Sequence, residues 1–300
     1  MVPQRRVARY MIRKVRDERA SRRRDTLAVE EPMEIRLNLP RSTGERRDHS
    51  LSVTMRTPGD DFELAVGFLY TEGVIESPDD VDEVTYCLGT EKTEQAYNVV
   101  SVRLRAGIHF DPELLQRNFY TTSSCGVCGK TSLEAIETRR CPILPQGHPV
   151  VPMETIHTLN EQLHSDQSVF QATGGLHAAG VFSADGELIG LREDVGRHNA
   201  VDKVIGERLL ADELPLNDRL LMVSGRASFE IMQKALVAGI PIVAAVGAPS
   251  SLAVDLAREF GMTLLGFVRG ERYNIYAGGA RIETAPIGEV AEVRESLASD

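Results

Sequence analysis

Apolar and polar residues alternate in short runs along the first third of the chain, which predicts strands that bury one face. Met33–Leu39 carries an apolar residue at every second position, and His49–Arg56 has the same period. A helix is expected from about residue 61 to Gly73, because its apolar residues recur at helical spacing. Val81–Leu88 and Asn98–Leu104 predict two more strands. Together these elements indicate a small α+β unit.

The second half of the chain alternates strands with helices. Leu220–Val223, Pro241–Val246 and Met262–Val268 are nearly continuous apolar runs, as expected for strands that are buried on both faces. A helical pattern follows each of the first two runs, and a predicted hairpin over residues 176–192 precedes them. This order predicts a mainly parallel sheet within a three-layer α/β core.

The front of the chain is strongly basic. The first 24 residues hold ten Arg or Lys against Asp17 and Glu18, and no apolar segment follows Arg5-Arg6 as a twin-arginine signal would require. We expect an unstructured or weakly helical extension. The predicted organisation is a basic disordered extension at 1–29, an N-terminal α+β subdomain at 30–115, an α/β domain at 116–285 and a tail at 286–300.

Composition narrows the class of protein. A chain of 300 residues with 42% hydrophobic content can bury a sizeable core. It has no apolar run near the roughly 20 residues that span a bilayer, and a net charge of −10 argues against a nucleic-acid-binding body. Four cysteines are too few for a disulfide scaffold. We therefore expect a cytoplasmic protein with neither a membrane nor a nucleic acid as its partner.

Candidate chemistry begins at Thr121–Lys130, where Cys125 and Cys128 are separated by two residues and flanked by glycines and small hydroxyl residues. Small neighbours leave sulfur accessible. The sequence from Thr131 to Glu134 has the form of a capping box, which predicts a helix to about residue 140. Its positive N-terminal end would favour the thiolate, which is the nucleophilic form of cysteine.

Four interpretations of this cysteine pair stay open. Half of a zinc site would need two more ligands, but Cys87 and Cys141 are isolated and no H-x3-5-H segment is present. A thioredoxin-type pair should follow a strand of a βαβ unit, whereas this pair follows a polar loop. The cysteines could also simply pack, as we expect for Cys87 within its predicted strand. The polar, glycine-flanked setting favours a nucleophilic or sulfur-carrying cysteine, with the second thiol assisting.

Polar segments at the ends of the predicted parallel strands form a second candidate site. Ser224–Ser228 and Gly247–Ser251 offer backbone N–H groups and hydroxyls at helix starts, which suits phosphate. Arginines nearby in the sequence can grip phosphate or stack on a purine. The residues predicted from this pattern to contact an anionic ligand are Ser224, Gly225, Arg226, Arg269, Arg272 and Asn274.

A further polar junction lies at Glu193–Asn199, where a predicted strand leads into a helix. Arg197, His198 and Asn199 are expected in the loop or cap at the N-terminal end of that helix. Such a junction is either a solvated helix start or a ligand site, and its many polar groups favour the ligand site. The dinucleotide, P-loop and nucleophile-elbow motifs are missing, and no H-x-E segment precedes a P-C-x-x-C, so these enzyme classes and zinc deaminases are disfavoured.

Five motifs together resemble a known family, the formate dehydrogenase accessory sulfurtransferases or FdhD/NarQ family. They are SSCGVCGKTS at 123–132, TGGLHAAG at 173–180, REDVGRHNAVDKVIG at 192–206, SGRASFEIMQKA at 224–235 and GFVRGERYNIY at 266–276. The resemblance covers about residues 30 to 280. It implies a cytoplasmic protein, usually a homodimer, with a cytidine-deaminase-like α/β core.

The resemblance also implies a function. In the family, a cysteine desulfurase passes sulfur to the first loop cysteine, and the persulfide is passed on to the metal of molybdenum (or tungsten) bis(molybdopterin guanine dinucleotide) before this enters the formate dehydrogenase catalytic subunit. By position, Cys125 would hold the persulfide and Cys128 would assist. The stretch implied to bind the cofactor, with GDP as a surrogate ligand, is Phe267, Val268, Arg269, Gly270, Glu271 and Arg272. Two alternatives remain, a non-catalytic cofactor chaperone and a dithiol oxidoreductase.

Overall fold

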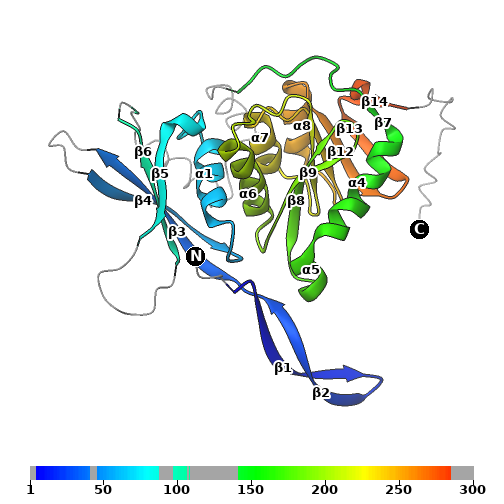
Figure 1. The fold of residues 1–300 in the computed structure, drawn as a ribbon. Coiled ribbons are helices and arrows are strands. Elements are labelled where there is room, and N and C mark those ends of the chain that lie inside the picture. Colours follow the sequence, from blue (N-terminus) through cyan, green and yellow to red (C-terminus); the bar gives the residue numbers. More distant parts are fainter. Residues whose placement is uncertain (1–4, 41–45, 88–96, 107, 109–140, 285–300) are drawn as a thin grey trace, which may run out of the picture.

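The computed structural model describes residues 5–40, 46–87, 97–106, 108 and 141–284. These residues form a protruding two-stranded arm, a four-stranded sheet and a larger, helix-covered sheet (Figure 1). The fold is mixed α/β, as the sequence predicts. Within the described ranges, no helix has the length and apolar character needed to cross a bilayer. The predicted helix at 131–140 and the predicted domain boundary near residue 115 lie outside the described residues.

The four-stranded sheet contains the strands that the period-two patterns predict. Its order is β4 (Arg46–Arg56), β3 (Glu31–Pro40), β6 (Val99–Leu104) and β5 (Val81–Tyr86). Helix α1 (Asp61–Thr71) packs on this sheet, because its apolar positions face those of the strands. The buried side chains that join helix and sheet include Met33, Ile35, Leu37, Leu64, Val66, Leu69, Val100 and Val102.

The basic front of the chain is folded, so the predicted disorder over residues 1–29 is wrong for the part described. β1 (Val7–Arg16) and β2 (Arg19–Ala28) pair antiparallel along their whole length. Asp17 and Glu18 connect them with φ values of 47° and 63°, the left-handed pair that a tight hairpin turn uses. A high charge density indicated disorder, but a hairpin needs only extended residues and a suitable turn, and β-branched and aromatic residues occur between the arginines.

The larger sheet has six strands in the order β13-β12-β11-β10-β8-β9. Its strands are β8 (His177–Ser183), β9 (Leu188–Asp194), β10 (Arg219–Val223), β11 (Ile242–Ala245), β12 (Thr263–Arg269) and β13 (Arg272–Ala277). Only β10, β11 and β12 are parallel to one another, and the remaining pairings are antiparallel. The prediction of a mainly parallel sheet is therefore wrong, because short turns after β8 and β12 reverse the chain, whereas helical crossovers produce parallel neighbours.

Helices cover both faces of this sheet and give three layers. On one face lie α6 (Arg197–Leu210), α7 (Phe229–Val237) and α8 (Ser251–Glu259), and on the other lies α4 (Met153–Asp166) (Figure 1). Along β10, Leu221 and Val223 pack toward the first group, while Leu220 and Met222 pack toward α4. The short helix α5 (Ser168–Thr173) and the two-residue strands β7 (Val151–Pro152) and β14 (Ile282–Glu283) complete the core. A specific likeness to cytidine deaminases stays a prediction.

Helices α1 and α6 cross between the two sheets (Figure 1). At the crossing, a Cβ atom on Gly67 would lie 1.9 Å from the backbone oxygen of Asp202, and a Cβ atom on Gly206 would lie 1.9 Å from that of Glu63. Only glycine fits at these two positions, because the helix backbones touch there. This contact fixes the smaller sheet against the layer that carries the candidate site.

Candidate functional site

Loops from several strands meet at the edge of the larger sheet where β10, β11 and β12 end. Gly247 N donates to Gly225 O at 2.9 Å, and Phe267 N donates to Gly247 O at 3.2 Å. On the other side, Ser224 N donates to Ala178 O at 3.0 Å, and Ser224 Oγ accepts from Ala178 N at 2.9 Å. The predicted strand-end segments thus form one continuous edge, as the carboxyl ends of parallel strands must.

Two glycines allow close approach along this edge. A Cβ atom on Gly247 would lie 3.0 Å from Gly225 O and 3.0 Å from Arg226 Cγ. A Cβ atom on Gly225 would lie 3.4 Å from His177 Nδ1 and 3.6 Å from Arg197 Cδ. Gly225 therefore lies between the loop after β11 and two basic side chains, so a ligand approaching its backbone would meet a histidine and an arginine.

Arg197 is the first residue of α6, at the helix end where the sequence predicts it. Its Nε atom is buried and has no hydrogen-bond partner within the described structure. Burial, and then the positive charge of Arg197, lower the pKa of the neighbouring His177. A guanidinium with an unused donor at a helix N-terminus is suited to bind an anionic group.

His198 belongs to a small cluster of hydrogen-bonding side chains. Its Nε2 atom lies 2.8 Å from Glu230 Oε2 and 3.1 Å from Ser228 Oγ. The hydrogen bond with His198 lowers the pKa of Glu230, against the effect of burial. The cluster ties the start of α6 to the start of α7.

Asn199 faces the smaller sheet. Its Nδ2 atom donates to Met55 O at 2.8 Å and to Asp194 Oδ1 at 2.9 Å, while its Oδ1 atom accepts from Thr54 Oγ1 at 3.2 Å. The amide thus links α6 to β4. The predicted ligand contact of Asn199 stays a prediction, and it would compete with these hydrogen bonds.

Phe267 departs from regular strand geometry. Its φ angle is 56°, in a left-handed region that bulky residues rarely adopt. The register of β12 and β13 is irregular there, and 43% of the residue is exposed. A ring held in this way at the sheet edge can stack on a planar ligand.

The other residues predicted to bind the cofactor differ in their exposure to solvent. Arg269 and Arg272 are exposed and directly opposite each other where β12 turns into β13. The turn between them is formed by Gly270, with φ 54°, and the exposed Glu271. Val268 is fully buried in the core on the α4 side, so only its backbone is available to a ligand. Exposed Asn274 lies on β13, where its Nδ2 atom donates to Tyr276 Oη at 3.4 Å.

The cysteines predicted to react, Cys125 and Cys128, lie outside the described residues. Cys87 directly follows β5 and is half-buried, and burial raises the pKa of its thiol. Cys141 is half-buried and packs against the core beside Tyr70. Across the described ranges there is no group of three or more His, Cys, Asp or Glu side chains that could hold a metal ion.

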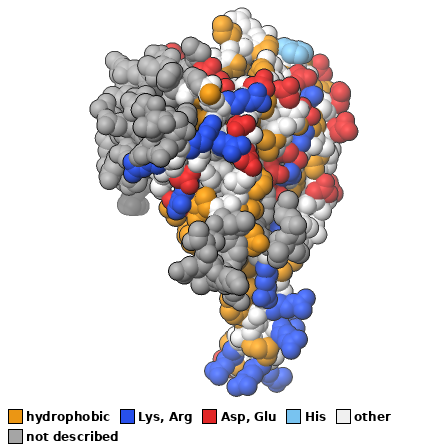
Figure 2. Space-filling model, turned by 60° about the vertical axis from the view of Figure 1, so that its left-hand side comes forward, with side chains coloured by type: hydrophobic (Ala, Val, Ile, Leu, Met, Phe, Trp, Pro, Cys, Tyr) orange, Lys and Arg blue, Asp and Glu red, His pale blue; other side chains and the backbone are white. Residues whose placement is uncertain are grey.

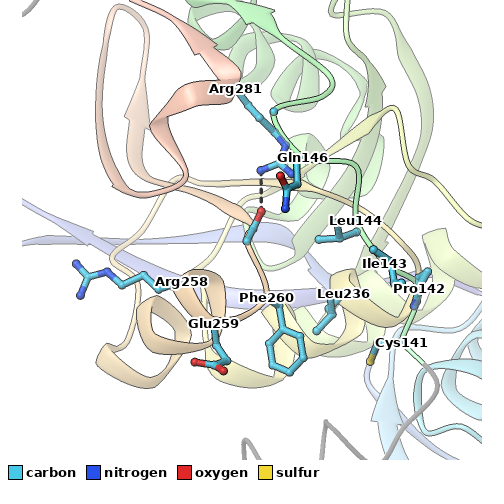
Figure 3. A pocket seen from close by; sticks show the side chains of 12 residues that line it. Cys141, Pro142, Ile143, Leu144, Gln146, Leu236, Arg258, Glu259, Phe260 and Arg281 are labelled. Atoms are coloured by element: carbon cyan, nitrogen blue, oxygen red, sulfur yellow. Dashed lines mark hydrogen bonds between the residues drawn. The ribbon is translucent and has the colours of Figure 1, made fainter.

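A hollow of about 630 Å³ lies at the opposite end of the larger sheet, beside the C-terminal ends of α7 and α8 (Figure 3). Leu236, Phe260 and Cys141 line it, and Arg281 donates to Gly261 O at 2.7 Å along its wall. None of the residues predicted from the sequence lines this hollow. It is therefore separate from the candidate site.

Two residues of the site were not predicted from the sequence. His177 is the second residue of the strand predicted over residues 176–183, and the glycine pair at 174–175 shortly before it was the available signal. Glu230 lies in the first turn of α7, where an acidic residue is ordinary capping composition. Their significance comes from their neighbours across the sheet, which the sequence does not specify.

The described structure thus defines an α/β protein with a polar, arginine-bearing edge suited to an anionic ligand. The chain belongs to the FdhD/NarQ family, whose model matches residues 28–283.

The chain is similar over most of its length to proteins named sulfur carrier protein FdhD. The chain is 52% identical over 276 residues to the sulfur carrier protein FdhD of Streptomyces coelicolor, covering 91% of this chain and 95% of the relative. It is 54% identical over 263 residues to the sulfur carrier protein FdhD of Mycolicibacterium paratuberculosis, covering 87% and 93%. A crystal structure from Desulfotalea psychrophila, of a candidate formate dehydrogenase accessory protein, matches with a TM-score of 0.69 at 24% identity, covering 92% and 99%. That match supports the fold.

Proposed function

We propose that this protein is a sulfur carrier that serves a formate dehydrogenase. The main support is sequence similarity: about half of all aligned residues, over nearly the whole chain, are identical to those of proteins named sulfur carrier protein FdhD. The name of the similar structure, a candidate formate dehydrogenase accessory protein, agrees with this role. A cysteine desulfurase is the proposed donor, and the dehydrogenase catalytic subunit is the proposed recipient.

The proposed reaction is a sulfurtransferase reaction with two exchange steps. The Cys125 thiolate attacks the outer sulfur of the donor persulfide, the donor S–S bond breaks, and the donor leaves as a thiolate. The Cys128 thiolate then attacks the Cys125 sulfur, a Cys125–Cys128 disulfide forms, and hydrosulfide leaves toward the metal. The second step is balanced, because the two cysteines supply the electrons that reduce the transferred sulfur.

The substrate that receives this sulfur is proposed to be the molybdenum or tungsten bis(molybdopterin guanine dinucleotide), held through its nucleotide ends. Arg197, with its unused donor, and the backbone around Gly225 suit a phosphate. Phe267 and the arginine pair at the β12–β13 turn suit a guanine and its phosphates. The homodimer implied by the family resemblance stays a prediction.

The test of the carrier role is the intact mass of the protein after incubation with a cysteine desulfurase and L-cysteine. The wild type should gain one sulfur atom, Cys125→Ala should gain none, and Cys128→Ala should gain sulfur but retain it in the presence of the cofactor. Cys141→Ala is the matched control and should behave as the wild type. If Cys125→Ala still gains the sulfur, the assignment is wrong, and a double Cys125→Ala/Cys128→Ala variant that fully supports dehydrogenase activity would favour a chaperone role.

A further inference from the structure

His177 has an imidazole ring without a hydrogen-bond partner among the described residues, at the edge where the proposed ligand would bind. It is the first residue of β8 and is half-buried. A Cβ atom on Gly225 would lie 3.4 Å from His177 Nδ1 and 3.6 Å from Arg197 Cδ. The two basic side chains therefore flank one backbone position, and no side chain of Gly225 separates them from a group bound there.

The acidic side chains around His177 already have partners. Asp194 lies opposite His177 in the pairing of β8 with β9, and its carboxylate lies 2.8 Å from Lys203 Nζ. Glu193 accepts hydrogen bonds from two backbone N–H groups at the start of α5. Glu230 of α7 is hydrogen-bonded to the other histidine of the edge. None of these three carboxylates is free to neutralise a proton on His177.

Positive charge surrounds the imidazole instead. Burial, followed by the charges of Arg197 and His198, lowers the pKa of His177, and Asp194 acts in the opposite direction with a smaller effect. On the remaining sides, Arg226 in the loop after β10 is exposed, and α5 has no titratable side chain. The imidazole of the free protein is therefore mostly neutral at pH 7. It lies beside a guanidinium whose Nε atom is buried without a hydrogen-bond partner in the described structure.

A bound phosphate would reverse this balance. A negative charge within a few ångströms favours the charged form of a histidine, because opposite charges attract. Once protonated, the imidazole has a donor on both ring nitrogens, and its hydrogen bond to a phosphate oxygen is about twice as strong as a neutral one. Binding of the anion and binding of the proton then strengthen each other, because the coupling between two bound species is reciprocal.

Other basic side chains are less suited to couple a proton to a ligand. His198 Nε2 already faces Glu230 Oε2 at 2.8 Å and Ser228 Oγ at 3.1 Å, so this nitrogen has partners without a ligand. The arm formed by β1 and β2 carries arginines at the surface, at the lower end of the view in Figure 2. These arginines can attract an anion, but they are already protonated. Proton uptake therefore distinguishes binding at His177 from binding at the arm.

We propose that His177 is a further binding residue of the sheet edge, which takes up one proton when the anionic ligand binds and donates it in a hydrogen bond to a phosphate oxygen. The proposal rests on the proposed function for the class of ligand, a guanine nucleotide end of the cofactor. The proton comes from the solvent and returns to it when the ligand leaves, so no bond of the ligand breaks. The site therefore binds its ligand more tightly as the pH falls from about 8 to about 6.

The test is isothermal titration of the full-length protein with GDP at about pH 7 in two buffers of different ionisation enthalpy, because the difference in heat counts the protons taken up. The wild type should take up a substantial fraction of one proton per GDP. Its affinity should rise at least about threefold between pH 8 and pH 6, within the limit of about tenfold per pH unit for one proton. His177→Gln should bind GDP more weakly and lose most of the uptake.

His148→Gln is the matched control. This histidine is exposed at the opposite end of the larger sheet, where its backbone oxygen accepts from Arg281, and the variant should take up protons as the wild type does. Protonation of GDP itself is the same with every variant and cancels in the comparison. Histidine NMR of the wild type gives a second measurement if His177→Gln does not fold, because one imidazole signal should titrate at a higher pH with GDP than without it.

Three outcomes overturn the proposal, and they differ in what they leave standing. Equal proton uptake in the wild type and His177→Gln, or no shift of any histidine signal, removes His177 from the site but keeps the nucleotide site. Binding without proton uptake that is lost in Arg13→Gln/Arg22→Gln moves the nucleotide to the arm. If the wild type does not bind GDP, the nucleotide site falls together with this proposal, and the gain of sulfur by Cys125 still tests the carrier role separately.

Discussion

Phe267 combines an exposed aromatic ring with a left-handed backbone conformation. The backbone conformation destabilises the folded protein, whereas the ring would stabilise a bound ligand. A non-glycine residue in this conformation costs about 1–2 kcal/mol. The hydrogen bond from Phe267 N to Gly247 O at the sheet edge helps to hold the backbone of Phe267 in this conformation. A ligand that stacks on the ring would return part of that cost. A substitution at Phe267 is therefore expected to change the stability of the protein and its affinity for the ligand in opposite directions.

Replacing Phe267 with glycine should stabilise the protein by up to about 1 kcal/mol, because glycine adopts a positive φ without strain. The same change should weaken GDP binding by about tenfold, as loss of a stacked aromatic is worth about 1–3 kcal/mol per base. Thermal unfolding and isothermal titration with GDP check the two effects. Phe267→Ala should weaken GDP equally without the gain in stability, and equal GDP affinity in all three proteins would remove the ring from the site.

The arginine pair at the β12–β13 turn gives a second ligand test. Arg269→Ala or Arg272→Ala should weaken GDP by about 1–3 kcal/mol, the range for hydrogen bonds to charged groups. Arg258→Ala is the control, because that arginine is exposed beside the separate hollow at the other end of the sheet. The affinity is measured by the same titration. Wild-type affinity in both turn variants would show that the nucleotide binds elsewhere.

His177 predicts a dependence of stability on pH. Burial, together with the charge of Arg197, lowers its pKa below the ordinary value of 6.5, so as the pH falls below that value the unfolded chain binds a proton that the folded protein does not. Stability is then lost on acidification and is unaffected by this group at higher pH. His177→Gln should therefore lose less stability than the wild type between pH 7.5 and 5.5, as measured by urea unfolding. Parallel losses in both proteins would contradict this assignment.

Among the helices, the crossing of α1 and α6 allows the least choice of residue. Each helix contributes a glycine to a point where the two backbones touch. A glycine inside a helix costs about 0.5–1 kcal/mol relative to alanine. Here the close packing of the two helices, which glycine permits, offsets that cost. The crossing also places the start of α6, and with it Arg197 and His198, at the sheet edge.

Gly206→Ala should destabilise the protein by about 1–3 kcal/mol or more, although alanine is the better helix former, because its Cβ atom would lie 1.9 Å from Glu63 O. Urea unfolding measures the loss. Gly279→Ala is a matched control, since a Cβ atom there would meet only Ile275 Cγ2 at 3.6 Å. A neutral or stabilising Gly206→Ala would mean that the helices are further apart than described.

The molecule as a whole is held together by buried charges between its parts. Lys234 of α7 lies 2.9 Å from Asp202 of α6 and donates to Thr71 of α1 at 2.9 Å. Asp194 of β9 lies 2.8 Å from Lys203 and accepts from Thr57 N at 3.0 Å, just beyond β4. These contacts connect the smaller sheet to the site layer, so we expect the two to unfold together.

Lys234→Met should lower the free energy of unfolding by about 3–5 kcal/mol, because it leaves the Asp202 carboxylate buried without its cation. The double change Asp202→Asn/Lys234→Met should recover part of that loss, since no unpaired charge then remains. Calorimetry should show a single transition in each protein. Lys14→Met in the exposed arm should change stability by less than about 0.5 kcal/mol, and two separate transitions in the wild type would contradict the coupling.

The positions of the helices and strands can be read from the order of apolar and polar residues, because strand and helix periods are local properties. The alternation of Met33–Leu39 and the apolar run of Leu220–Val223 predict β3 and β10 correctly, and the glycine-rich and arginine-bearing segments that follow the later strands identify most of the candidate site. Its motifs also identify the family. These features need no knowledge of which segments are neighbours.

The arrangement of these elements could not be read in this way, because strand direction and helix crossings depend on contacts between residues far apart in the chain. The tertiary structure made the sheet mixed, folded the basic front into a hairpin, and placed Gly67 against Gly206. It also brought His177 to Gly225 and Arg197, and turned Asn199 toward β4. A local pattern cannot specify such pairs, since their free energy comes from packing that exists only in the folded chain.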